Sequence, residues 1–335
     1  MALDLAAARA AHPDLVDRAA LGLHDAGSAD AASLAAFLAD AFGPATVAVV
    51  HYGSHVTAGE HRPGSALDFF VVVDGYPAAY ASVVARADTG MSADRAARLA
   101  RRLPPNVVSV VDGESGLHAK CAVYSLSDFR RACGEDAPDH FAQGRLFQQV
   151  QLLWARGAAE REQVAEVLVG VRLRTLHWGR PYLPASFDAA AYCQALLERS
   201  FAAEIRPEKA DRTRELLAAQ APVLHPAFAA VLALHAAGGE LVGEGGAYRL
   251  ARPVTAGERA RWAAYFARSK ARATLRWAKY VALYDDWLEY VVKKVERRTG
   301  QTIDLTPRER RWPLVFLWPR AIRFLRDRPQ NRRTP

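Results

Sequence analysis

Four short segments rich in β-branched and aromatic residues limit most strongly what this chain can fold into. They lie in the first half of the sequence, at residues 46–52, 67–73, 106–111 and 118–124. Gly, Pro, Asp or Ser bounds each of them, as is typical of strands that end in turns. A helical spacing of apolar residues at 30–42 precedes the first segment and stops at Gly43-Pro44. The pattern predicts a small mixed sheet with flanking helices.

The rest of the chain has a mainly helical pattern. Helices are expected over residues 160–176, 187–201, 227–237 and about 256–298. Residues 240–250 interrupt them with the pattern of a two-stranded hairpin around Gly245-Gly246. We therefore expect an α+β protein with three parts. These are a sheet domain at 1–150, a helical, winged-helix-like domain at 151–255, and a helical tail at 256–335.

Charge divides the chain into an acidic body and a basic tail. The net charge is +8, yet residues 259–335 hold 20 Lys and Arg against 7 Asp and Glu, while residues 1–258 hold 24 against 29. The tail should therefore meet a polyanion, either phospholipid headgroups or nucleic acid. A composition of 51% hydrophobic residues excludes a disordered or collagen-like chain.

The cysteines and the apolar runs suggest a cytoplasmic protein. Cys121, Cys133 and Cys193 are far apart and lack CxxC spacing, so neither a disulfide framework nor a zinc site is indicated. No apolar run is expected to reach the roughly 20 residues of a membrane span, and the N-terminus does not resemble a signal peptide. Any membrane contact is then expected to be peripheral, on the inner face.

The first two expected strands carry residues suited to phosphate chemistry. Gly53-Ser54 ends the first strand, and Asp68 lies near the start of the second, inside an otherwise apolar run. A glycine lets the backbone approach a triphosphate, a serine hydroxyl binds its oxygens, and an acid on the next strand can hold Mg²⁺. A tight turn beside a solvated Asp is the simpler alternative. An unpaired charge in an apolar strand is costly, which favours a metal or phosphate role.

These residues and several later motifs resemble one family of nucleotidyltransferases. The strand and turn YGSHV at 52–56 precede LDF at 67–69, with Ala66 where a first acid would stand. Further matches follow in order, namely LHAKCAV at 117–123, GRL at 144–146, LPASF at 183–187 and SFAAEIR at 200–206. This series resembles the mitochondrial translocator-assembly-and-maintenance type of CDP-diacylglycerol synthase, a phosphatidate cytidylyltransferase. The resemblance implies a polymerase-β-like nucleotidyltransferase domain.

The resemblance also implies roles for single residues. Gly53 and Ser54 would bind the triphosphate, Asp68 and Glu204 would hold Mg²⁺, and Lys120 would contact a phosphate as a catalytic residue with Asp68. Arg145 and Arg206 would be further nucleotide-phosphate ligands, although surface salt bridges are an alternative for both. An ordinary edge lysine is the alternative for Lys120. The sequence departs from the family at His55, Gln148 and Ala203-Glu204, and Gln148 replaces a lysine.

The tail has the composition of a membrane anchor. It contains five of the seven tryptophans, namely Trp262, Trp277, Trp287, Trp312 and Trp318. An apolar run from Pro313 to Pro319 lies between arginines. Trp prefers the headgroup boundary and Arg binds anionic phosphates, so an anionic membrane surface is the expected partner and nucleic acid is not. Alternatively, the aromatic residues pack the tail helix onto the body and the arginines form its solvated face.

The sequence thus predicts Mg²⁺-dependent transfer of CMP from CTP to phosphatidic acid at a membrane surface. One alternative is a nucleotidyltransferase that acts on an RNA end or a small molecule, which would use the same Gly53, Ser54 and Asp68. Another is a binding protein without catalysis, which Ala66 and the substituted motifs would explain. The base preference, the acceptor and the oligomeric state do not follow from these residues.

Overall fold

The computed structural model describes residues 3–57, 65–87, 89–203, 210–283, 288, 292, 296 and 302–311. The chain forms two compact units, residues 1–280 and 281–335. The expected boundaries after residues 150 and 255 both fall inside the first unit. In the second unit a capping box begins helix α14 (Pro307–Arg311), because Thr306 and Glu309 exchange side-chain to backbone hydrogen bonds of 2.8 and 3.3 Å.

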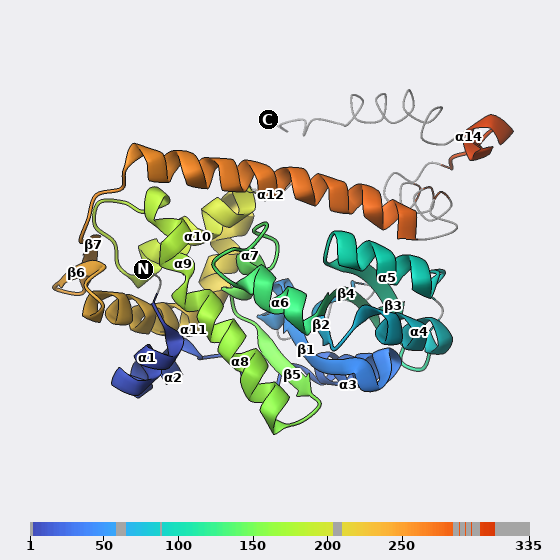
Figure 1. The fold of residues 1–335 in the computed structure, drawn as a ribbon, viewed down its shortest axis with the longest axis horizontal. Coiled ribbons are helices and arrows are strands. Elements are labelled where there is room, and N and C mark those ends of the chain that lie inside the picture. Colours follow the sequence, from blue (N-terminus) through green and yellow to red (C-terminus); the bar gives the residue numbers. More distant parts are fainter. Residues whose placement is uncertain are drawn as a thin grey trace, which may run out of the picture. The chain divides into compact units, whose positions relative to one another are not determined.

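A five-stranded mixed sheet with the order β3-β4-β2-β1-β5 organises the first unit (Figure 1). Its strands are β1 (Thr46–Tyr52), β2 (Leu67–Val73), β3 (Asn106–Val111), β4 (His118–Ser125) and β5 (Gln151–Ala155). The β2 and β4 strands are parallel, and the other neighbours are antiparallel. The four expected strands are confirmed. The fifth escaped prediction because QLLWA contains no β-branched residue.

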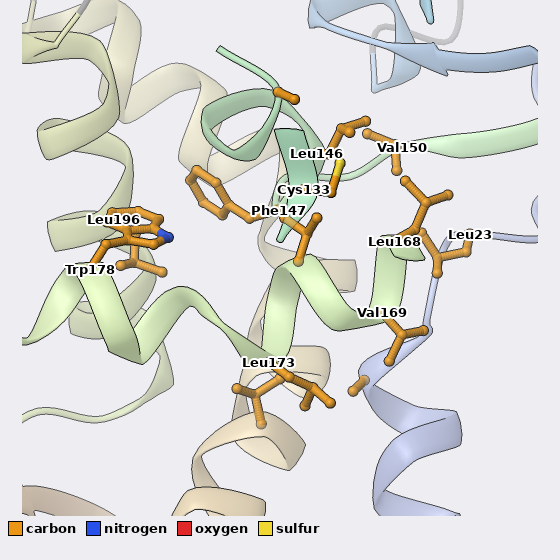
Figure 2. Packing of buried hydrophobic residues seen from close by; sticks show 14 of the residues in the cluster. Leu23, Cys133, Leu146, Phe147, Val150, Leu168, Val169, Leu173, Trp178 and Leu196 are labelled. Atoms are coloured by element: carbon orange, nitrogen blue, oxygen red, sulfur yellow. The ribbon is translucent and has the colours of Figure 1, made fainter. Parts of the chain in front are cut away.

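Helices cover both faces of this sheet. One group packs on β1, β3 and β5 and comprises α3 (Ala29–Phe42), α4 (Tyr76–Arg86) and α5 (Ala93–Arg102). The opposite face meets α6 (Leu126–Cys133), α7 (Gln143–Leu146) and α8 (Ala158–Leu173). Leu146 of α7 and Leu168 and Val169 of α8 belong to this second core, part of which Figure 2 shows. This face also carries the candidate site, because Asp68 is two and four residues before the core residues Phe70 and Val72 on β2 and so lies on the same face of the sheet.

A helical layer continues from α8. Its helices are α9 (Thr175–Gly179), α10 (Ala189–Ala202) and α11 (Ala210–Ala237). The N-terminal helices α1 (Leu5–Ala11) and α2 (Pro13–Ala19) pack on this layer. The expected hairpin is confirmed as β6 (Leu241–Glu244) and β7 (Ala247–Leu250). Its turn needs glycines, because Gly245 and Gly246 have φ values of +59° and +86°. Tyr248 joins the hairpin to the chain before α10 through a two-way backbone pairing with Phe187.

Helix α11 differs from expectation in its length and hydropathy. Among the described helices it is the one long and apolar enough to cross a membrane, at Thr213–Ala237 with a mean hydropathy of 1.6. The sequence was expected to contain no such run. Leu224, Phe228 and Val231 of this helix are fully buried in the core that α8 and α10 share. Helix α11 therefore serves as a core helix of the first unit.

Helix α12 (Ala256–Leu283) begins the basic tail, and its first part packs on the body. Trp262, Tyr265 and Phe266 are buried, and the Phe266 ring centroid lies 6.2 Å from that of Trp178. In Figure 1 the helix (orange) runs past α10 and α7 toward α5. Lys279 donates to the carbonyls of Leu103 and Pro105 just beyond α5.

An ion-pair cluster fixes the same helix to the segment before α7. Asp139 accepts two hydrogen bonds from Arg276, at 2.7 and 3.0 Å, and one from Arg272 at 2.8 Å. The backbone N–H of His140 donates to Ser269 Oγ at 2.9 Å. The inward-facing residues of α12 thus pack this helix onto the rest of the first unit, which was the alternative to a membrane anchor. Four basic residues of the helix are exposed, namely Arg259, Arg261, Arg268 and Lys270. Trp312, Trp318 and the run between Pro313 and Pro319 lie outside the described residues.

Candidate functional site

The turn after β1 brings backbone and hydroxyl groups to one end of the sheet. Gly53 has φ +92° and ψ −169°, a conformation that is essentially restricted to glycine. Ser54 then begins a short 3-10 helix (Ser54–Val56), which the hydrogen bond from Val56 N to Gly53 O closes at 3.2 Å. The expected Gly-Ser turn is therefore a sharp, glycine-dependent feature.

Asp68 lies directly beside this turn. It pairs in register with Tyr52 on β1 and with Lys120 on β4, so the turn, the acid and the lysine lie side by side. A Cβ atom added to Gly53 would come within 3.2 Å of Asp68 Oδ2. Asp68 is half-buried, and the described residues provide it with no hydrogen bond. Lys120 is exposed and extends from the same face, since paired residues of neighbouring strands point the same way.

Basic side chains face Asp68 from three segments. Burial raises the pKa of Asp68 above its ordinary value, while the charges of Lys120, Arg145 and His55 act in the opposite direction. Arg145 comes from α7, where its guanidinium stacks 4.1 Å above the Phe141 ring and donates to the Phe141 carbonyl at 3.0 Å. His55 contacts Ser65 Oγ through Nε2 at 3.0 Å. One carboxylate among three bases makes this end of the sheet suited to bind an anion.

Of the two expected Mg²⁺ ligands, only Asp68 lies within the described residues. In the described ranges, no group of three or more His, Cys, Asp or Glu side chains is placed to hold a metal ion. Glu204, the second expected ligand, and Arg206 lie outside the described residues. Asp68 itself fits one ligand position, because its half-buried carboxylate accepts no hydrogen bond from the described part of the chain. A cation beside it would offset its burial cost.

Two motif residues near Arg145, Gly144 and Gln148, have packing roles in the structure. A Cβ atom at Gly144 would lie 2.8 Å from the His140 ring, so α7 can approach His140 only with a glycine there. Gln148 donates to the Gly144 carbonyl at 2.7 Å and accepts from Gln220 at 3.3 Å. Gln148 is therefore held by internal hydrogen bonds between α7 and α11.

Sequence reasoning missed the residues that hold Arg145 in place. Phe141 lies between two guanidinium groups, with Arg145 at 4.1 Å and Arg276 at 4.8 Å from its ring centroid. Arg276 is in turn fixed by Asp139, 137 positions earlier in the chain. No local pattern could have indicated that contact. The aromatic residue four positions before Arg145 was the available signal, because such pairs meet on one side of a helical turn.

Replacing Gly53 by Ala should separate strain from ligand contact. The backbone conformation costs a non-glycine residue about 1–3 kcal/mol, so the free energy of unfolding should fall by that amount. Because the new Cβ atom also presses on Asp68, the variant should in addition bind CTP more weakly in isothermal titration. Gly116→Ala is the matched control. Gly116 has φ +72° and no atom within 4 Å of an added Cβ, so this variant should lose stability only. Equal CTP affinity in both variants would mean that Gly53 serves the turn alone.

No protein-family model matches the chain, and no curated protein matches it.

Proposed function

We propose that this protein is a Mg²⁺-dependent nucleotidyltransferase of polymerase-β-like fold. In this proposal it is a phosphatidate cytidylyltransferase, which transfers CMP from CTP to phosphatidic acid and releases pyrophosphate. The observation that carries the proposal is the alignment of Gly53, Asp68 and Lys120 at one end of three adjacent strands. Arg145 faces the same carboxylate from α7. A glycine turn, an acid and two cations in this arrangement suit a nucleoside triphosphate with its metal ion.

Each group has a defined task in that reaction. The backbone at Gly53 and the hydroxyl of Ser54 would bind triphosphate oxygens, and Lys120 and Arg145 would neutralise their charge. Asp68, with Glu204 as the second ligand that the family resemblance implies, would hold Mg²⁺. The ion supplies further neutralisation of the phosphates as pyrophosphate leaves.

The acceptor needs little activation. A phosphate oxygen of phosphatidic acid attacks the α-phosphorus of CTP in line. A new P–O bond forms while the bond to the β-phosphate oxygen breaks, so that CDP-diacylglycerol and pyrophosphate result. Because the attacking oxygen is already anionic, no strong general base is required. Catalysis then consists mainly of positioning and charge neutralisation.

The choice of a lipid acceptor rests on the order of the sequence motifs and on the tail. The tail combines 20 basic residues with five tryptophans, a composition suited to an anionic membrane surface on the cytoplasmic side. Four of these basic residues are exposed on the part of α12 that belongs to the first unit, namely Arg259, Arg261, Arg268 and Lys270. An RNA end or a small molecule as acceptor is the alternative, since the same basic residues would attract nucleic acid.

One assay distinguishes these functions. The protein is incubated with Mg²⁺, each α-labelled nucleoside triphosphate in turn, and either phosphatidic acid liposomes or an RNA oligonucleotide. We expect label from CTP alone to enter the extracted lipid, and the protein to sediment with the liposomes. Label in RNA would favour the alternative acceptor. Triphosphate binding without transfer to either acceptor would indicate a binding protein without catalysis.

A further inference from the structure

Arg199 on α10 is a half-buried cation that lacks the partners such a group normally has. Its guanidinium lies 3.9 Å from the ring centroid of Phe266 on α12 and 4.4 Å from that of Tyr182. Within the described residues it donates no hydrogen bond and forms no ion pair, and its Nε is buried without a partner. A partly desolvated charge without a counter-ion is unfavourable, so it calls for an anionic ligand.

A neighbouring arginine shows what a paired cation in this region looks like. Arg180 lies two residues before Tyr182 and forms an ion pair with Glu258, with its Nε 3.2 Å from the carboxylate, although this Nε, like that of Arg199, is buried without a hydrogen bond. It also donates to the Arg252 carbonyl at 3.2 Å. The two aromatic rings at Arg199 restrain the guanidinium but leave its N–H edge without an acceptor. A guanidinium group that two rings restrain loses little side-chain entropy when it binds an anion.

The location of Arg199 connects it to the candidate site. Burial, together with the charges of Arg145 and Arg199, lowers the pKa of His140 to about 3. His140 also contacts Ser200 Oγ at 3.0 Å, and an added Cβ at Gly144 would lie 3.6 Å from Ser200 Cβ. Arg145 and Arg199 thus each adjoin a residue that packs on the neutral His140 ring. Two guanidinium groups near one buried ring can hold two anionic groups, one from each substrate.

We infer that Arg199 binds the phosphate of the acceptor, a lipid phosphomonoester, beside the nucleotide held at Gly53, Asp68 and Arg145. This inference rests on the proposed function for the identity of the acceptor. A phosphomonoester matches the planar guanidinium, which can donate two parallel hydrogen bonds to its oxygens. The half-buried ring of Tyr182 provides an apolar border, which suits a ligand with a glycerolipid body.

The test uses equilibrium binding, which does not depend on catalysis. Dihexanoyl phosphatidic acid, inorganic phosphate and CTP are titrated separately into the full-length protein and into Arg199→Gln, Arg199→Lys and Arg180→Gln. Arg199→Gln removes the guanidinium and its two charge-assisted hydrogen bonds to the phosphate, which should weaken the affinity for dihexanoyl phosphatidic acid about tenfold. Arg199→Lys should recover part of it. The affinity for CTP should stay unchanged in both Arg199 variants, and Arg180→Gln should change the affinity for neither CTP nor dihexanoyl phosphatidic acid.

Other results would overturn the inference. Unchanged affinity for phosphatidic acid in Arg199→Gln would do so, and so would a parallel loss of CTP affinity, which would assign Arg199 to the nucleotide. Inorganic phosphate that binds as tightly as the lipid, with the same loss, would make free phosphate the ligand. Arg199-dependent lipid binding in a protein that transfers no CMP would count against the proposed function and support the site.

Discussion

Replacement of Asp68 by Asn is expected to reduce nucleotidyl transfer about 1,000-fold, the several kcal/mol that a metal ion contributes to such a transition state. The two side chains have the same shape, so Asn keeps the packing of β2 while it removes the negative charge beside Gly53. In the proposed reaction the variant would bind Mg²⁺ weakly, and Lys120 and Arg145 alone would neutralise the phosphates. Label transfer from CTP to phosphatidic acid, measured over a range of Mg²⁺ concentrations, gives the loss.

Asp74→Asn is the matched control for this variant. Asp74 follows the opposite end of the same strand, is exposed, and pairs with Arg156 at 2.5 Å. Its replacement should leave transfer unchanged. The Asp68 variant should also be at least as stable as the parent protein, because burial raises the pKa of Asp68 and so disfavours its charged form at neutral pH. Full activity in a folded Asp68→Asn protein would contradict the nucleotidyltransferase proposal.

The strands were predictable because their signal is local. β-Branched residues between turn-forming residues define β1 to β4, and each begins at the expected residue. Helix α11 begins well before the expected residue 227. The expectation started too late because Pro222 and Pro226 lie inside the helix, where prolines usually mark a helix end. Helix α12 was predicted as a helix, but its inward-facing residues were not, since Arg272, Arg276 and Lys279 resemble a solvated basic face until their partners are known.

The candidate site was predictable to the extent that it lies on neighbouring strands. Gly53, Ser54 and Asp68 are close in sequence, so a hairpin-like pairing of two strands brings them together. The placement of Lys120 beside Asp68 depends on the parallel pairing of β2 with β4, which a sequence pattern does not specify. Arg199 gave no signal, because its lack of a partner is a property of three-dimensional packing alone. Glu204 and Arg206 lie outside the described residues and stay predictions.

The segment that carries Arg145 depends on the cluster around Asp139, and this cluster should dominate the effect of mutations on stability. The Asp139 side chain is 4% exposed and that of Arg276 is 7% exposed. Asp139→Asn would leave Arg276 and Arg272 near each other without a counter-ion. Breaking a buried ion pair in this way costs about 3–5 kcal/mol, so the free energy of unfolding measured with urea should fall by about that amount. Asp40→Asn is the control, since its pair with Arg86 is exposed and should contribute less than about 1 kcal/mol.

The effect of Asp139 should depend on pH in a defined direction. Burial by itself would raise the pKa of this carboxyl, but hydrogen bonds and charge from Arg276, with the hydrogen bond from Arg272, outweigh burial and lower it. An acid with a depressed pKa in the folded state stabilises the protein above its unfolded pKa of about 3.9, and this contribution disappears as the pH falls through the folded pKa. The stability difference between the parent protein and Asp139→Asn should therefore be constant near neutral pH and shrink below about pH 4. A difference that grew on acidification would show that the two arginines do not control this carboxyl, and that the segment before Arg145 is held by other contacts.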